Sequence, residues 1–440
     1  MFTGWAWLPI RKLKKIFMRQ KKVECIALLA ALELVLVVIV GGVPTQAEEM
    51  PVKIEAIETS SNADFEKWLD ALRKEASSAG ISDTTLDEAL QDVKLAIGVI
   101  KRDRSQFEFS ETFLHYLRKT VTEDRIERGR QLLLQHQKLL DNIYSQFNVP
   151  PRYLIALWGL ETNFGDNLGG FPVIDALVTL AYDRRRTNFF RAQLLDALRI
   201  IEDGHVNPSA MKGSWAGAMG QMQFMPSTFV QYAIDFSGDG RKDIWKNLPD
   251  AFSSAANYLS TMGWKTGQLW GREVLLPDDF DLMLTTMNIK KTVQEWAELG
   301  VRRANGSDLP QVTMEGSIVL PQGHKGPAFL VYGNFRIILQ WNRSIHYAIS
   351  VGHLADRIVG LPRIANGIDA DDQPLSRHQI EQIQRYLNLL GFEAGSVDGL
   401  VGSTTKAAIR AFQAENLIPA DGYPSIDLLH LLRAQAAASL

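Results

Sequence analysis

Most of the chain carries apolar residues at intervals of three or four positions, which is the pattern of helices with one buried face. The stretch DFEKWLDALRKEASSAGI shows this pattern at Phe65, Trp68, Leu69 and Leu72. RIERGRQLLLQHQKLLDNIYSQF repeats it, so the region from 64 to 143 is predicted to be helical. Further helices are expected after Pro150-Pro151 and at 189–203, 226–236, 250–262 and 344–359.

Strand-like patterns are confined to two short stretches, SIVL at 317–320 and AFLVY at 328–332. The segment PQGHKGP between them is rich in glycine and proline, as turn-forming loops are. Further on, GIDADDQPLS at 367–376 is acidic and polar and contains a proline, which is typical of a linker. We therefore expect a mainly α-helical domain with a small β element over 60–363, a linker at 364–375 and a small three-helix module at 376–436.

The first 47 residues carry a cluster of lysines and arginines, then the apolar run IALLAALELVLVVIVGG and then PTQA. A basic region, an apolar region and a small-residue cleavage site define a secretory signal. Residues 1–47 are therefore predicted to export the chain from the cytoplasm and to be removed after Ala47. An uncleaved membrane anchor is the alternative, although the run is short for a membrane span and Glu33 interrupts it.

Composition narrows the classes of partner. The chain has 440 residues, 46% of them hydrophobic and 22% charged, which fits a globular protein of two or three domains. Its net charge is −3, and loss of the basic leader makes the exported part more acidic, so no nucleic-acid partner is expected. The one cysteine, Cys25, cannot form an internal disulfide.

The stretch LIALWGLETNF at 154–164 places a carboxylate, Glu161, inside an apolar run. In a helix, Leu157 and Trp158 share its face, so the side chain is predicted to point inward. Gly165 is expected to stop the helix and to leave Glu161 in the last turn, near the negative end of the helix dipole. Burial and the dipole both disfavour the charged form, so we expect the raised pKa that a general acid in glycosidic cleavage needs. A structural glutamate paired with an arginine or a backbone donor is the alternative.

A second candidate segment is SWAGAMGQMQFMPS at 214–227. Its glycines allow the backbone to approach a ligand closely. Ser214, Gln221 and Gln223 add neutral hydrogen-bonding groups beside apolar faces, which suits an uncharged sugar. A glycine-rich turn between core helices is an equally good explanation of this segment.

The segment DFSGDGRKDIW at 235–245 resembles a calcium-binding loop. Asp235, Ser237 and Asp239 stand at loop positions 1, 3 and 5, and the carbonyl of Arg241 stands at position 7. The glutamate expected at position 12 is absent, so Asp250 is the candidate for the closing carboxylate. A simple Asx-turn is the alternative.

Six separated segments together resemble one family, the B-type lytic murein transglycosylases, which cut bacterial peptidoglycan. They are WGLETNFG, DRRRTNFF, SWAGAMGQMQFMPS, the acidic loop with IW after it, ANYLSTMGW and NFRIILQWNRSIHYAISV, spread over about residues 64–362. The C-terminal unit resembles a helical peptidoglycan-binding module through IQRYLNLLGF and VDGLVGSTTKAAIRAFQ. The resemblance implies a lysozyme-like α+β catalytic domain, with peptidoglycan glycan strands as the partner and cell-wall synthesis or division proteins as further candidates.

By the same resemblance, Glu161 is the catalytic acid and base. The residues expected to bind substrate are Tyr116, Ser214, Gln223, Tyr258, Trp341, Asn342 and Tyr347 for the saccharide, and Arg185 and Arg186 for the peptide stem. Trp341 stands where a tyrosine is expected, so no hydroxyl contact is assigned to it. The family's structural calcium loop maps onto Asp235, Ser237, Asp239, Arg241 and Asp250, and no cofactor is expected for the chemistry.

The sequence nominates no second carboxylate convincingly, because Asp166 and Asp175 lie within reach of Glu161 in the sequence but neither sits in a comparable apolar setting. A two-carboxylate hydrolase needs such a partner, whereas a substrate that supplies its own nucleophile does not. We therefore expect a lytic transglycosylase that cuts between MurNAc and GlcNAc and leaves a 1,6-anhydro-MurNAc end. A muramidase that hydrolyses the same bond and a non-catalytic peptidoglycan-binding scaffold are the alternatives.

Overall fold

A computed structural model describes residues 62–105, 111–183, 186–367 and 372–438. The predicted leader at 1–47 and Arg185 lie outside these ranges. Within them, no helix combines the length and the apolar character that crossing a membrane requires.

Helices make up most of the described chain from its first residues to Thr261, in agreement with the periodicity. The helices in this part are α3 (Asn62–Ser78), α4 (Asp83–Leu90), α5 (Ile97–Ser105), α6 (Phe113–Thr120), α7 (Glu123–Gln135), α8 (Gln137–Phe147), α9 (Pro151–Thr162), α10 (Val173–Tyr182), α11 (Thr187–Glu202), α12 (Pro226–Tyr232) and α13 (Leu248–Thr261), with the 3₁₀ turn η1 (Pro208–Ala210). α10 and α11 pack against each other, and β1 (Phe171–Pro172) pairs with β2 (Lys212–Gly213) beside them.

α9, which carries Glu161, is the central helix of this bundle. It begins at Pro151, because a proline in the first turn gives up no hydrogen bond there. α7, α8, α13 and α16 (Ile345–Ile358) all contact it, and every residue from Tyr153 to Thr162 is buried. Glu161 is therefore buried as predicted, but the reasoning from helix phase needs correction, since this helix has no face in water.

The end of α9 also differs from the prediction in detail. The helix stops at Thr162, and Asn163, Phe164 and Gly165 all have positive φ angles. This left-handed run turns the chain back, so that the Phe164 ring packs edge-on against Trp158 at 5.7 Å between ring centroids. Glu161 remains in the last turn, as expected.

A five-stranded antiparallel sheet forms the β part of the domain, in the order β4-β6-β7-β3-β5. Its two predicted strands are confirmed as β6 (Glu315–Val319) and β7 (Ala328–Val331), which pair with Ser317 opposite Val331. The strands not predicted are β3 (Gly271–Leu275), β4 (Lys291–Thr292) and β5 (Arg302–Arg303). The 3₁₀ turn η2 (Leu282–Leu284) and the helix α14 (Val293–Glu298) lie between these strands in the sequence.

Two helices return the chain from the sheet to the bundle. α15 (Gly333–Trp341) follows β7 directly, and α16 follows α15 after a turn at Asn342, Arg343 and Ser344. The Ser344 hydroxyl caps α16 by accepting a hydrogen bond from the backbone N–H of Tyr347. This short connection between α15 and α16 determines where Trp341 and Tyr347 lie.

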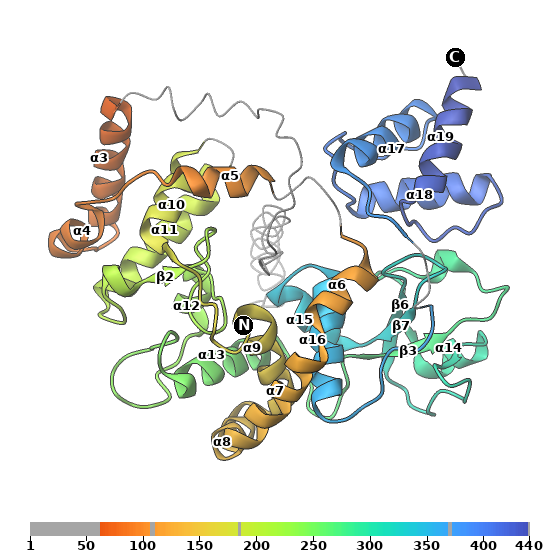
Figure 1. The fold of residues 1–440 in the computed structure, drawn as a ribbon, viewed down its shortest axis with the longest axis horizontal. Coiled ribbons are helices and arrows are strands. Elements are labelled where there is room, and N and C mark those ends of the chain that lie inside the picture. Colours follow the sequence, from red (N-terminus) through yellow and green to blue (C-terminus); the bar gives the residue numbers. More distant parts are fainter. Residues whose placement is uncertain (1–61, 106–110, 184–185, 368–371, 439–440) are drawn as a thin grey trace, which may run out of the picture. The chain divides into compact units, whose positions relative to one another are not determined.

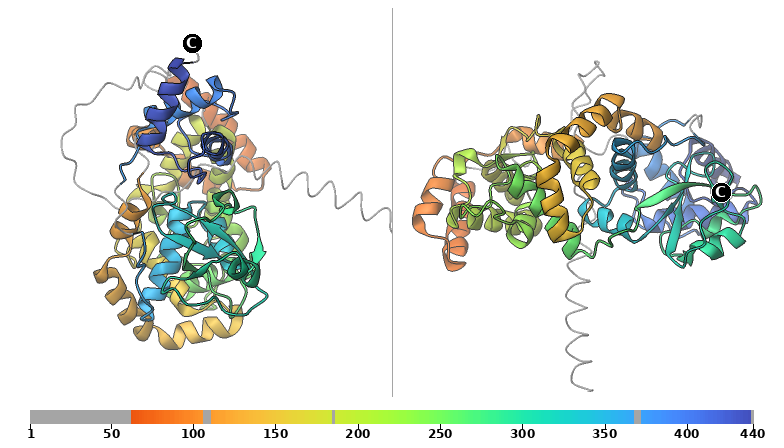
Figure 2. Two further views of the ribbon diagram at one scale, coloured as in Figure 1. Left: turned by 90° about the vertical axis from the view of Figure 1, so that its right-hand side faces the viewer. Right: turned by 90° about the horizontal axis from the view of Figure 1, so that it is seen from below.

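The C-terminal module contains three helices, as predicted, and has a core of its own. α17 (Arg377–Leu389), α18 (Ser403–Glu415) and α19 (Ile426–Ala438), coloured blue in Figures 1 and 2, pack around Ile383, Leu387, Ile409, Phe412 and Leu432. A capping box between Ser376 and Gln379 starts α17, and the predicted linker before it stays a prediction.

Candidate active site

The carboxyl group of Glu161 lies in a dry setting and its two oxygens are bonded unequally. The side chain is only 4% exposed. Its Oε1 accepts hydrogen bonds from the Tyr347 hydroxyl at 2.5 Å and from the Trp341 indole Nε1–H at 2.8 Å. Its Oε2 is buried and has no hydrogen-bond partner among the described residues.

Burial raises the pKa of Glu161 from its ordinary value of 4.5 to about 7. Desolvation is the cause, and the hydrogen bonds from Tyr347 and Trp341 oppose it by stabilising the ionised form. Neither a cation nor a second carboxylate is among the described groups that shift this pKa. Glu161 can therefore carry a proton near neutral pH and lose it without a large cost, which a group that gives and later takes back a proton requires.

An aromatic cluster holds the indole of Trp341 in place. The indole packs edge-on against Phe224 at 5.3 Å and against Tyr258 at 5.1 Å between centroids. Tyr258 in turn packs edge-on against Tyr232. Side chains from α12, α13 and the loop before α12 thus surround the end of α15, where Trp341 donates its hydrogen bond to Glu161.

The glycine-rich segment at 214–227 is tied to α9 through Gln221. The side-chain oxygen of Gln221 accepts from the Trp158 indole N–H at 2.7 Å, and its backbone carbonyl accepts from the Thr162 hydroxyl at 2.9 Å. Thr162 is next to Glu161 in the sequence, and Trp158 lies three residues before it, about one helical turn away. The loop is therefore part of the same assembly as the carboxylate, and Gln221 is the residue that joins them.

The other residues predicted in this segment face inward and make internal bonds. The Ser214 hydroxyl accepts from the backbone N–H of Ala218. The Gln223 side chain donates to the backbone carbonyls of Leu168 and Gly220, and Gln223 itself has a positive φ of 48°. Such a backbone conformation is costly for a residue other than glycine and occurs often at functional sites.

Tyr116 and Asn342 also lie in the buried region. The charge of Glu161 contributes to a pKa of the Tyr116 hydroxyl that is raised above its ordinary value, mainly by burial. Asn342 is 4% exposed and accepts a hydrogen bond from the backbone N–H of Ser344. The charge of Glu161 therefore acts on Tyr116 of α6.

Arg186 lies in a different kind of environment. Its guanidinium pairs with Asp103, which is almost fully buried, and lies over the ring of Phe190 at 4.9 Å. This pairing fixes the start of α11, and the predicted contact of Arg186 with a peptide stem stays a prediction. The same holds for Arg185, which is outside the described residues.

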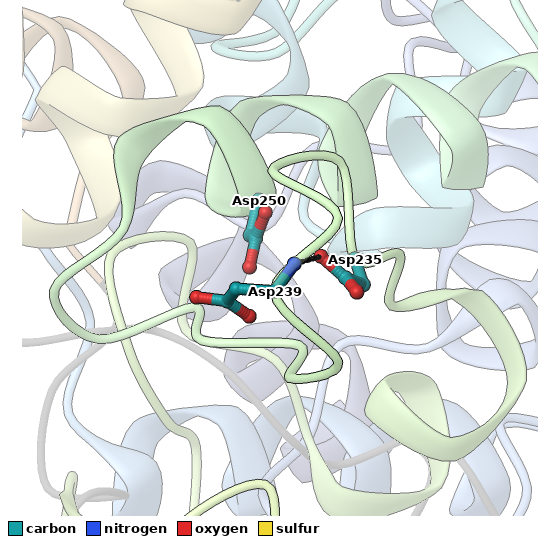
Figure 3. A group of neighbouring side chains, drawn as sticks. All are labelled: Asp235, Asp239 and Asp250. Atoms are coloured by element: carbon teal, nitrogen blue, oxygen red, sulfur yellow. Dashed lines mark hydrogen bonds between the residues drawn. The ribbon is translucent and has the colours of Figure 1, made fainter.

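The predicted calcium loop brings three carboxylates together. Ligand oxygens of Asp235, Asp239 and Asp250 lie within 4.8 Å of one another (Figure 3). Asp250 is fully buried in the first turn of α13 and accepts hydrogen bonds from the backbone N–H groups of Phe236, Ser237 and Asp243. The late arrival of Asp250 in the sequence therefore does not prevent it from closing the loop.

The two acids near Glu161 in the sequence do not share its setting. Asp166 is exposed and forms an ion pair with Arg128, which lowers its pKa. Asp175 has a pKa raised by burial, yet it is only half-buried and lies in the first turn of α10. Neither is a group that shifts the pKa of Glu161.

The sequence and the fold of this chain are similar to those of known proteins. Residues 64–356 match the family model described as Transglycosylase SLT domain, and residues 376–432 match a model for a peptidoglycan binding domain. The first match spans well over half of the chain. The chain therefore belongs to the lytic murein transglycosylases. It is of the SltB type, whose members are lyases that act on peptidoglycan and need no cofactor for their chemistry.

Three similar proteins illustrate the family. Membrane-bound lytic murein transglycosylase B of Escherichia coli (strain K12) is 32% identical over 260 residues, which is 57% of this chain and 68% of the relative. The crystal structure of SltB3 from Pseudomonas aeruginosa in complex with NAG-anhNAM-pentapeptide is 46% identical, with a TM-score of 0.82, and the match covers 84% of this chain and 99% of that one. The Escherichia coli enzyme Slt35 in complex with calcium is 29% identical, with a TM-score of 0.56, over 68% and 93% of the two chains.

The expected family and the mainly helical fold are thus confirmed. Two features of the site escaped prediction: the indole N–H bond from Trp341 to Glu161 and the bridging role of Gln221. Both depend on where distant segments meet in space, and the sequence carries no local signal for that.

Proposed function

We propose that the protein cleaves the β-1,4 bond between MurNAc and GlcNAc without water and leaves a 1,6-anhydro-MurNAc end. Glu161 acts alone, first as general acid and then as general base. The observation that carries this proposal is the buried carboxyl group of Glu161, whose pKa is raised to about 7. Among the described residues, no second carboxylate contributes to this pKa shift. A relative solved with NAG-anhNAM-pentapeptide supports it further.

The proposed steps balance protons and bonds. Glu161 gives its proton to the glycosidic oxygen, and the bond from that oxygen to C1 of MurNAc breaks. The N-acetyl oxygen of the same sugar stabilises the cationic C1. The ionised Glu161 then takes the proton of the O6 hydroxyl, and O6 bonds to C1, so the enzyme ends in its starting state.

Residues around Glu161 are proposed to hold the saccharide. Ser214, Gln223, Asn342, Tyr116 and Tyr258 supply neutral polar groups and aromatic faces, and all five are buried or nearly so. Such a surface suits an uncharged sugar chain better than an ionic ligand. Arg185 and Arg186 keep the proposed role toward the carboxylates of the peptide stem.

Digestion of purified sacculi in water labelled with heavy oxygen tests the reaction. The products should be anhydro-muropeptides without the label, as read by mass spectrometry, and Glu161→Gln should release none. Reducing-end muropeptides carrying the label would instead establish a muramidase. No release by the folded wild-type protein, together with binding to sacculi, would establish the scaffold alternative.

We also propose that the protein works in the periplasm after export by residues 1–47, or tethered to the inner membrane where the signal is kept. The named relative from Escherichia coli is membrane-bound. Fractionation with mass spectrometry of the mature N-terminus tests this: a chain beginning after Ala47 supports cleavage. Division or cell-wall synthesis proteins remain predicted partners, testable by cross-linking in cells.

A structural calcium ion is the further element of the proposal. The cluster of Asp235, Asp239 and Asp250 fits it, because calcium prefers hard carboxylate and carbonyl oxygens and tolerates irregular geometry. Ser237 and the carbonyl of Arg241 would complete the ligand set. Calcium should raise the melting temperature of the wild type and not that of Asp239→Asn, while magnesium should act weakly. Equal melting temperatures with calcium and with a chelator would exclude the ion.

A further inference from the structure

The two oxygens of Glu161 have different roles available to them. Oε1 accepts two hydrogen bonds, from Tyr347 and Trp341. Oε2 is buried, and within the described part of the chain no donor or acceptor reaches it. A proton on Oε1 would have to sit among donors that already point at this oxygen, whereas a proton on Oε2 meets no such conflict.

The two donors are not equivalent. A tyrosine hydroxyl donates or accepts, because it rotates about its C–O bond, so Tyr347 alone would tolerate a proton on either carboxyl oxygen. An indole N–H only donates and does not ionise in the working pH range. Trp341 therefore selects one arrangement of the carboxyl proton, and Tyr347 does not.

The indole cannot turn away from Glu161 without disturbing its surroundings. Phe224 and Tyr258 pack edge-on against it from the loop before α12 and from α13. Trp341 is also the last residue of α15, so its backbone is held by the helix on one side and by the buried Asn342 on the other. The donor is thus pre-positioned, and little order is lost when Glu161 changes its protonation state.

We propose that Trp341 is a positioning residue that keeps the transferable proton on Oε2 of Glu161 throughout the reaction. The inference rests on the proposed function, in which Glu161 is both acid and base. The Oε2–H bond breaks as the glycosidic oxygen gains the proton, and Oε2 later gains the proton of the O6 hydroxyl. Oε1 keeps its bonds to Trp341 and Tyr347 in both states, so the same oxygen gives and receives.

Other titratable groups near Glu161 do not replace this role. Tyr116 on α6 and Tyr347 on α16 both have a hydroxyl pKa raised by burial and by the charge of Glu161, so both remain protonated in the working pH range. Arg125 on α7 acts electrostatically on Tyr116. None of these groups is an obligate neutral donor to the carboxyl group.

Infrared difference spectroscopy between the wild type and Glu161→Gln, recorded below pH 7, tests where the proton lies. With the proton on Oε2, the carbonyl is Oε1 and accepts two hydrogen bonds, so its stretching band should appear at low frequency. A band at the frequency of a free carbonyl would overturn the proposal, because Oε2 would then be the carbonyl. This measurement needs no activity, so its result is separate from the fate of the proposed reaction.

Substitution of Trp341 sharpens the test. Trp341→Phe should move the carbonyl band upward and raise the proton affinity of Glu161 about tenfold, because a donor to the ionised form is lost. The alkaline limb of kcat/KM should move up by about one pH unit with it. Trp341→Tyr, which restores a donor, should move both readouts back toward the wild type.

Trp270→Phe is the matched control. Its indole N–H also donates at 2.8 Å to a carboxylate, that of the partly buried Asp356. It should leave the Glu161 band and the pH limb unchanged while lowering the melting temperature. If Trp341→Phe behaves in the same way as this control, Trp341 is merely structural and the proposal fails.

Discussion

Glu161 is a buried carboxylate and Asp356 a partly buried one, and each accepts a hydrogen bond of 2.8 Å from a tryptophan indole. In each, the other oxygen makes no hydrogen bond with the described residues. Burial raises the pKa of both. They differ in their remaining neighbour: Asp356 has the cation of Arg152 at 3.7 Å, whereas Glu161 has the neutral hydroxyl of Tyr347. An indole donor alone therefore does not define the proposed catalytic acid. We infer that the neutral surrounding of Glu161 is what leaves it free to exchange its proton in the proposed reaction.

The largest expected difference concerns activity. Glu161→Gln should lower the release of muropeptides from sacculi by about a thousandfold or more, because the proton donor is lost. Asp356→Asn should stay within a few-fold of the wild type, because Asp356 takes no part in the reaction. A large loss in Asp356→Asn, in a protein that circular dichroism shows to be folded, would contradict the comparison.

The free energy of unfolding should change in opposite directions when Glu161 and when Asp356 is replaced. The pKa of Glu161 is raised, so the native state loses stability as the pH rises from 4.5 through about 7. Glu161→Gln removes this cost and should raise the free energy of unfolding by about 2 kcal/mol at alkaline pH, with the gain vanishing in acid. Asp356→Ala should lower it by about 2 kcal/mol, since the N–H of Trp270 is left buried without an acceptor. Urea titrations at both pH values measure the two changes.

The pH dependence of the wild type separates the two acids further. Glu161 must start protonated, so kcat/KM should fall as the pH rises through about 7, by about tenfold between pH 6 and pH 8. Asp356→Asn should show the same fall. If the fall of kcat/KM occurred at a different pH in Asp356→Asn, the group whose titration causes the fall would be Asp356.

The smallest effect is expected for Tyr347→Phe. It removes one of two donors to the ionised carboxylate, so the pKa of Glu161 should rise and the alkaline limb should move upward. Trp341 still holds the carboxyl group, so activity at acidic pH should fall only a few-fold. Tyr153→Phe, which removes another buried hydroxyl, is the control and should leave the limb in place.

The sequence around Glu161 and the sequence around Asp356 follow the same pattern. A carboxylate inside an apolar helical run describes Glu161 in LIALWGLETNF, yet it describes Asp356 in AISVGHLADRI as well. Only the resemblance to a family distinguished them. The neutral or charged neighbour that separates their chemistry comes from segments far away in the chain, Tyr347 in one case and Arg152 in the other.

The fold was predictable where the pattern is long and periodic. α9, α11, α13 and α16 lie within two or three residues of their predicted bounds, whereas the predicted helix at 226–236 ends early, at Tyr232. The strands β4 and β5 have only two residues each, too few for an alternating pattern to show. β3 pairs with β7 across more than fifty residues of chain, and no local signal announces such a pairing.

The helix α16 carries both Asp356 and Tyr347, the residue that donates a hydrogen bond to Glu161. Tyr347 stands in the first turn of α16 and Asp356 in its last turns, about 13 Å apart along the axis. An inserted or deleted residue between them would rotate one end by about 100° relative to the other and so disconnect either Glu161 or Trp270. The number of residues between 347 and 356 must therefore stay the same. A library that varies loop or helix lengths in this enzyme should leave this segment untouched.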